Sequence, residues 1–162
     1  MELLVIRHAI AAPGSMHLPD AERPLTPEGR ARFTQVIQGL QHLKIHLDQL
    51  YHSPWRRAVE TAELLTPLLE GAAVSHAGLA RPPGLELLET IGGERVAVVG
   101  HQPWMGELVA WLTMGTLVDG SLFAFKRGGV AWLEGRPKPG RMALRAFLPP
   151  KVLRTLAEAA AR

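Results

Sequence analysis

The sequence predicts an α/β protein, a three-layer sandwich whose central sheet is mostly parallel with antiparallel strands added. Over the first two-thirds of the 162 residues, short apolar runs alternate with helical patterns, as in parallel βαβ units. From Gly120 onward, short apolar runs are separated by glycine-rich turns, which is typical of antiparallel strands. With 47% hydrophobic and 20% charged residues, we expect a single domain over residues 1–162.

Composition excludes several classes of function. The chain has no cysteine, which rules out disulfides, thiolate catalysis and cysteine-based metal sites. The net charge is +3, and fourteen arginines and four lysines are scattered, so we expect no nucleic-acid partner. No apolar run approaches the ~20 residues that span a bilayer, and no basic segment precedes the first strand; we expect no membrane association and a cytoplasmic location. The lack of asparagine and cysteine follows a trend of heat-adapted proteins.

The chain opens with a strand that ends in two adjacent polar residues. Residues 2–6 form an apolar run of the kind found in buried strands of parallel sheets. Arg7 and His8 follow at the carboxyl end of this strand, the edge where ligands bind in open α/β sheets. Taken alone, the pair is better explained by an arginine bound to a carboxylate and a histidine covering the core.

A loop and a helix come next. Residues 12–25 contain three prolines and a glycine, which predicts a loop over the strand ends. Arg23 lies in this loop, where a solvated surface arginine is the default interpretation. Thr26, followed by proline and glutamate, predicts a helix start, and apolar residues at helical spacing continue to near Lys44.

The second strand and helix introduce two further arginines. Residues 47–52 predict a short strand, and residues 53–54 start a helix that we expect to end at Gly71. Arg56 and Arg57 lie in its first turn, where the helix dipole favours anions by about 0.3–1 kcal/mol. An external anion would resolve this conflict. Solvation or pairing with acids would resolve it equally well, and the pattern does not separate the two arginines.

Another strand repeats the pattern of the first. Residues 95–101 contain an apolar run rich in valine and end in His101, just after Gly100, which permits close backbone approach. Residues 103–113 then predict a helix. A core histidine is the simplest explanation of His101 alone, but two strands that both end in histidine make it less satisfactory.

The remaining regions complete the fold. Residues 72–84 are expected to be irregular, with a short strand at 73–76, before a short helix at 85–91. The last third predicts strands at 122–125, 130–134 and 142–147, a hairpin loop at 135–140 and a final helix at 151–160.

The polar residues at one sheet edge favour an anion. Arg7, His8, Arg23, Arg57 and His101 supply cations and two imidazoles, with no carboxylate or thiol. Arginines beside two histidines would repel a metal ion, and no G-x-S-x-G nucleophile motif is present, so we expect no metal, no cofactor and no serine hydrolase. Arginines hold phosphate well, and neutral imidazole can attack phosphorus.

Four motifs in order resemble the histidine phosphatase superfamily, which has the phosphoglycerate mutase-like fold. Arg7-His8-Ala9 resembles its N-terminal signature, and residues 23–29 (RPLTPEG) resemble its "RPLT-x-x-G" segment. Residues 53–62 (SPWRRAVETA) resemble "SP-x-x-RA-x-QTA", and residues 98–103 (VVGHQP) resemble the second-histidine motif. Together the motifs span most of the first two-thirds of the chain.

The resemblance implies a role for each matched residue. It makes His8 the nucleophile that becomes phosphorylated, and Arg7, Arg57 and His101 the phosphate pocket. Arg23 corresponds to an additional phosphate-contacting arginine. The motif at residues 53–62 selects Arg57, and not Arg56, as the phosphate-binding arginine. Activity should need neutral His8 and fall as the pH drops through its pKa, ordinarily about 6.5; a rate independent of pH from 5 to 8 would contradict this.

Two departures from the family pattern point to the substrate. The signature continues with Ala9 instead of glycine, and residues 78–83 lack the acid that many members use to protonate the leaving group. Glu86 and Glu89 follow, but as expected surface residues. The resemblance is strongest to bacterial phosphohistidine phosphatases, whose phosphoramidate substrates have a better leaving group, and the lack of a large cap insertion suits a phosphorylated protein. The first alternative is a phosphomonoesterase or mutase-like enzyme of the same superfamily that acts on a small phosphorylated metabolite. The second is a catalytically inactive module that binds phosphate or a phosphoprotein.

Overall fold

The computed structural model describes residues 1–162 and has the expected fold class. Its sheet has six strands: β1 (Glu2–Arg7), β2 (Leu47–His52), β3 (Leu69–Ser75), β4 (Arg95–Gly100), β5 (Val130–Gly135) and β6 (Met142–Leu148). The strand order is β3-β2-β4-β1-β5-β6. The first four strands pair in parallel, whereas β5 is antiparallel to both β1 and β6. The sheet is therefore mostly parallel, with an antiparallel addition at one side.

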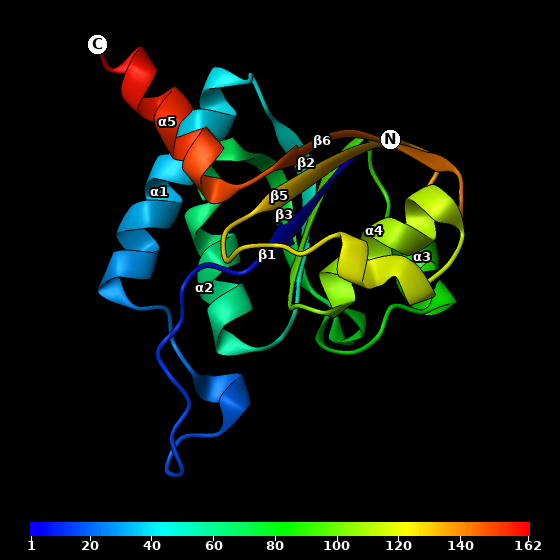
Figure 1. The fold of residues 1–162 in the computed structure, drawn as a ribbon, viewed down its shortest axis with the longest axis horizontal. Coiled ribbons are helices and arrows are strands. Elements are labelled where there is room, and N and C mark those ends of the chain that lie inside the picture. Colours follow the sequence, from blue (N-terminus) through cyan, green and yellow to red (C-terminus); the bar gives the residue numbers. More distant parts are fainter.

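Helices cover both faces of the sheet. They are α1 (Pro27–His42), α2 (Arg56–Leu64), α3 (Leu85–Thr90), α4 (Trp104–Met114) and α5 (Pro150–Ala160). Figure 1 shows α1, α2 and α5 on one side of the sheet and α3 and α4 on the other. None of the helices combines the length and the apolarity that crossing a bilayer requires. The three layers confirm the predicted sandwich.

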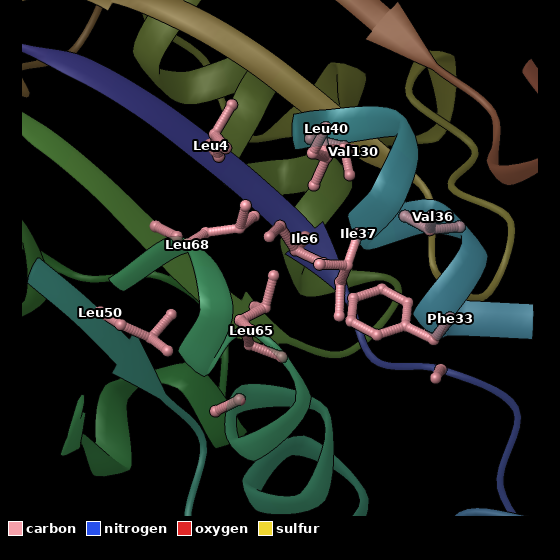
Figure 2. Packing of buried hydrophobic residues seen from close by; sticks show 14 of the residues in the cluster. Leu4, Ile6, Phe33, Val36, Ile37, Leu40, Leu50, Leu65, Leu68 and Val130 are labelled. Atoms are coloured by element: carbon pink, nitrogen blue, oxygen red, sulfur yellow. The ribbon is translucent and has the colours of Figure 1, made fainter. Parts of the chain in front are cut away.

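Each face of the sheet has its own hydrophobic core. Side chains alternate along β1, so that Leu4 and Ile6 join the cluster beneath α1, α2 and α5, whereas Leu3 and Val5 join the one beneath α3 and α4. Figure 2 shows Ile6 among the inward side chains of α1, including Phe33 and Ile37. Strand β1 is thus buried on both faces, as its continuous apolar run predicts.

The connections create a crevice at one edge of the sheet. Strands β1 and β4 are neighbours, with Arg7 opposite Gly100 in the ladder. The helix after β1 lies on one face and the helix after β4 on the other, because α1 contributes to the first core and α4 to the second. The chain therefore diverges at the carboxyl ends of these strands, where open α/β sheets bind ligands.

Two of the expected elements were wrong. The second helix ends at Leu64 instead of Gly71, because a turn containing Pro67 interrupts it and residues from Leu69 onward pair with β2. Strand β3 therefore includes Gly71, where a side chain would collide with the Asp48 carbonyl.

The expected strand at residues 122–125 is also absent. A 3₁₀ helix occupies Val118–Leu122, and the Phe125 amide donates locally to the Phe123 carbonyl at 3.0 Å instead of to a sheet. Phe125 is nevertheless buried, with its ring centroid 4.8 Å from that of Phe147. Its apolar character therefore serves packing and not strand pairing.

Candidate active site

A pocket of about 240 Å³ lies at the carboxyl ends of β1 and β4. It brings together all five residues selected from the sequence and adds five that sequence reasoning missed. The complete lining is Arg7, His8, Asp20, Arg23, Trp55, Arg57, His101, Gln102, Trp104 and Arg127.

His8 is buried and held in one tautomer. Its Nδ1 lies 2.7 Å from the Ala9 carbonyl, and its Nε2 lies 3.2 Å from Arg57 Nε. A carbonyl oxygen can only accept a hydrogen bond, and a guanidinium N–H can only donate one. Nδ1 therefore carries the proton and donates, whereas Nε2 accepts through its lone pair. Burial lowers the pKa of His8 to about 3, against the Ala9 hydrogen bond and with help from the charges of His101 and Arg57. The ring is therefore neutral at physiological pH.

Arg57 links three parts of the site. Helix α2 begins one residue before it, and its side chain is only 4% exposed. Its Nη2 binds the Asp20 carboxylate at 3.0 Å, its Nη1 donates to the Asp20 carbonyl at 2.6 Å, and its Cζ lies 4.7 Å from the Trp55 ring centroid. Neighbouring Arg56 is instead exposed and binds Glu60 at 2.9 Å. The structure thus places Arg57 in the pocket and Arg56 outside it, a distinction that the residue pattern alone did not make.

His101 faces His8 across the pocket. The two ring centroids are 5.1 Å apart, and His101 Nε2 lies 2.7 Å from Ser53 Oγ. Its Nδ1 is buried without a hydrogen-bond partner. Burial, followed by the charge of Arg57, lowers the pKa of His101 to about 3.

Arg7 also has an unpaired group. Its Nη1 donates to the Phe125 carbonyl at 2.6 Å, but its Nε is buried without a partner. Burial, together with the nearby Arg127 and Arg57, lowers the pKa of Arg7. A buried donor without a partner costs about 1–3 kcal/mol, and both this group and His101 Nδ1 belong to pocket residues.

The expectation that the site contains no carboxylate was wrong. Asp20, from a 3₁₀ turn in the loop before α1, lies in the pocket wall with Oδ1 2.8 Å from Arg23 Nε and Oδ2 3.0 Å from Arg57 Nη2. Burial acts to raise the pKa of Asp20, but the hydrogen bonds and charges of Arg57 and Arg23 outweigh it, so the pKa is lowered. The solvated role assigned by default to Arg23 was likewise wrong, because it also donates to the Ala12 carbonyl at 2.7 Å.

Arg127 enters the site from the turn before β5. The Gly128 amide donates to the Arg7 and His8 carbonyls at 3.0 and 3.1 Å, which attaches this turn to the end of β1. Positive φ at Gly128, which is 80°, suits glycine there. The double glycine after Arg127 was the one sequence signal for this turn, but nothing in the pattern placed it beside His8.

Two buried side chains attach α2 to the rest of the site. Thr61 Oγ1 accepts the Ala9 amide at 3.0 Å and donates to the Arg57 carbonyl at 2.6 Å, which joins the end of β1 to α2. Glu60 accepts the Leu25 amide at 2.7 Å and lies 2.9 Å from Arg30, which joins the loop to the same helix. Both residues position functional side chains without lining the pocket.

The assembled site is suited to an anion. Four arginines line the pocket against a single carboxylate, and both imidazoles are neutral. No three His, Asp or Glu side chains of the structure are grouped so that they could hold a metal ion. Guanidinium groups bind phosphate oxygens in pairs, and a neutral imidazole beside them offers a nucleophile.

Comparison with known proteins agrees with this chemistry. A model of the histidine phosphatase superfamily (branch 1) matches residues 3–81. An uncharacterised protein of Picosynechococcus sp. is 33% identical over 142 residues, which cover 83% of this chain and 85% of the relative.

Solved structures share the fold. The protein histidine phosphatase SixA in complex with tungstate is 24% identical, with a TM-score of 0.77 and coverage of 94% of this chain and 99% of that one. A phosphoserine phosphatase of Entamoeba histolytica is 17% identical, with a TM-score of 0.70 and coverage of 94% and 98%. The family-model match, the relative and the fold together show that the chain belongs to the histidine phosphatase superfamily.

Proposed function

We propose that this protein is a phosphatase that removes phosphate from a phosphorylated histidine of another protein, through a covalent intermediate on His8. The observation that carries the proposal is the unprotonated Nε2 of a neutral, buried His8, which lies 3.2 Å from Arg57 in a pocket with four arginines. Such a nitrogen is a nucleophile at physiological pH, and the arginines stabilise negative charge that develops on the phosphoryl oxygens.

The reaction proceeds in two displacements. The lone pair of His8 Nε2 attacks phosphorus, an N–P bond forms, and the bond from phosphorus to the leaving nitrogen breaks with its electron pair going to the protonated imidazole of the substrate. Water then attacks the phosphoryl group, its proton is lost to solvent, and the N–P bond to His8 breaks to release inorganic phosphate. The proton stays on His8 Nδ1, which donates it to the Ala9 carbonyl throughout, and this keeps Nε2 available.

The surrounding residues bind the phosphoryl oxygens. Arg7, Arg23, Arg57 and His101 line the pocket together with His8. The structurally similar SixA was solved in complex with tungstate, an oxyanion like phosphate, which agrees with an anion as the ligand proposed here.

The lack of a carboxylic acid placed to protonate the leaving group favours a phosphoramidate substrate. The pocket carboxylate, Asp20, is bound to Arg57 and Arg23 and is ionised, so in this arrangement it has no proton to give. Glu86 is exposed and binds Arg81, and Glu89 is exposed as well, which agrees with the surface role expected of both. An alkoxide leaves poorly without an acid, whereas the imidazole of phosphohistidine leaves readily once its ring is protonated.

A substrate comparison tests the proposal. The protein is incubated with a histidine-phosphorylated protein domain and, in parallel, with sugar phosphates and phosphoserine. We expect a kcat/KM at least about 100-fold higher for the phosphohistidine domain, which corresponds to nearly 3 kcal/mol of transition-state stabilisation. A preference for the phosphate esters would assign the protein to small phosphorylated metabolites instead. Phosphate binding without turnover of any substrate would identify an inactive binding module.

The pH dependence should differ from that of an ordinary histidine. A fall in rate between pH 8 and 5 was expected from an ordinary histidine. Because burial lowers the pKa of His8 to about 3, His8 stays neutral in that range, and its protonation slows the reaction only near pH 3.

The free energy of unfolding should depend on pH in a different range. The unfolded chain binds protons at both histidines from about pH 6.5 downward while the folded chain does not, so stability falls as the pH drops from 6.5 toward 3.

Urea unfolding of the wild type and of His8→Gln at pH 7 and pH 5 measures this effect. The variant should lose less stability between the two pH values than the wild type does. An equal loss in both proteins would show that His8 takes up its proton normally in the folded state.

Replacing Asp20 with asparagine should tighten the binding of inorganic phosphate. The Asp20 carboxylate occupies guanidinium groups of Arg57 and Arg23 that we assign to phosphate, so removing its charge should lower Kd by about threefold to tenfold at low salt. Isothermal titration with orthophosphate measures the effect. Glu22→Gln is the matched control, because this exposed residue lies in the same 3₁₀ turn outside the pocket. Weaker binding by Asp20→Asn would mean that the carboxylate mainly holds the arginines in place.

A further inference from the structure

A second basic hollow adjoins the pocket. It measures about 50 Å³ and is lined by Arg32 of α1, Arg127 of the turn before β5 and Arg154 of α5, among others. A wider groove beside it is lined by Arg7, Arg32, Lys126 and Arg127, with Ile10 and Pro150. Arg127 lines both of these spaces and the pocket itself. Cationic side chains therefore continue from His8 across the surface toward α1 and α5.

The charges of this surface are largely uncompensated. No Asp or Glu lines the hollow or the groove. Arg32 binds Glu28 at 2.6 Å, and both side chains are at least half exposed, so solvent weakens that pair. Lys126, Arg127 and Arg154 form no ion pair, although other arginines of the protein do.

Arg154 adds a third guanidinium group to the hollow. Arg154 Nε is inaccessible to solvent and has no hydrogen-bond partner. The other three side-chain atoms of this kind are Arg7 Nε and His101 Nδ1 of the pocket and Asp48 Oδ1, which lies outside it. Together with Arg32 and Arg127, Arg154 gives the hollow three arginines and no acidic residue in its lining.

We infer that this surface, defined by Arg32, Lys126, Arg127 and Arg154, binds acidic side chains that flank the phosphohistidine on the substrate protein. The inference rests on the proposed function and names a feature of its substrate. The phosphoryl group binds beside His8 in the pocket, so the hollow is left to parts of the substrate that lie beyond it. Arg32 of α1 and the adjacent Lys126 and Arg127 of the turn before β5 are all exposed, so they suit a broad protein surface with carboxylates.

Two synthetic peptides test this inference. Both carry one phosphohistidine, flanked by aspartate and glutamate in the first and by asparagine and glutamine in the second; inorganic phosphoramidate measures turnover that needs the pocket alone. At low salt, we expect the wild type to prefer the acidic peptide by about tenfold in kcat/KM, and this preference to shrink as ionic strength rises.

Matched double variants locate the effect. Arg32→Gln/Lys126→Gln should reduce the preference to about twofold or less, with phosphoramidate turnover nearly unchanged. Arg136→Gln/Lys138→Gln removes the same charge from the exposed β5–β6 hairpin and should keep the full preference. This hairpin lies at the opposite end of the sheet from the pocket, because the Gly135 amide donates to the Met1 carbonyl at the start of the chain.

The outcomes separate this inference from the proposed function. Equal rates for the two peptides, or equal losses in both double variants, would overturn the acidic docking surface and leave the phosphatase in place. A preference that appears only between sugar bisphosphates and monophosphates would assign the hollow to a second phosphate of a small substrate and overturn the inference too. No turnover of phosphoramidate or either peptide would overturn the proposed function itself.

Discussion

Replacing His8 with alanine should lower kcat for a phosphohistidine substrate by at least about 10⁴-fold, the scale on which enzymes lose activity without their nucleophile. The reason is that no other pocket side chain offers a comparable nucleophile. The Nδ1 of His101 is buried, and its Nε2 lies 2.7 Å from Ser53 Oγ. Rapid-quench kinetics with ³²P-labelled substrate measure both the rate and the label bound to the protein.

The alanine variant has an informative control. His46 is exposed and does not line the pocket, so His46→Ala should keep wild-type turnover and wild-type labelling. His8→Ala should still bind orthophosphate, because Arg7, Arg57 and His101 remain. Retained phosphatase activity in His8→Ala, or label on another residue, would refute the proposed mechanism.

Replacing Arg57 with alanine should lower kcat/KM by about 10³-fold, because its guanidinium is placed to stabilise charge on the phosphoryl oxygens. The same change removes the hydrogen bond to His8 Nε2 at 3.2 Å and both contacts to Asp20. Steady-state kinetics with phosphoramidate measure the loss without any contribution from protein docking.

The preceding residue provides a control of the same type. Arg56→Ala removes an exposed arginine that binds Glu60, so we expect turnover within about twofold of the wild type and a stability loss below about 1 kcal/mol. Equal kinetic losses in the two variants would show that the positive charge of the helix start matters and not the particular guanidinium beside His8.

Residues that follow a strand directly could be predicted from the sequence. Arg7, His8 and His101 lie at the ends of β1 and β4 in the pocket, because a buried strand fixes where its next residue emerges. The assignment of Arg57 to the site depended on the family motif, since helical spacing alone does not decide whether Arg57 or Arg56 points inward.

Residues on long loops could not be predicted in the same way. Asp20 and Arg127 reach the pocket through tertiary contacts, from Arg57 to the Asp20 carbonyl and from Gly128 to the end of β1. No local pattern encodes these contacts. The misplaced end of the second helix had both a local and a non-local cause, because the turn with Pro67 interrupts the helix and pairing with β2 sets the start of β3 at Leu69.

The register between β1 and β4 has a consequence for how the protein responds to its ligand. The His8 amide donates to the Gly100 carbonyl at 3.0 Å, so the two imidazoles are brought together only when this ladder has formed. An unfolded chain has no equivalent arrangement of residues 7, 57 and 101, and a phosphate-like anion should therefore bind the native state alone. By mass action, an anion at 100 times its Kd would add about 2.7 kcal/mol to the free energy of unfolding. Cellular phosphate would then act as a folding ligand for this protein as well as its reaction product.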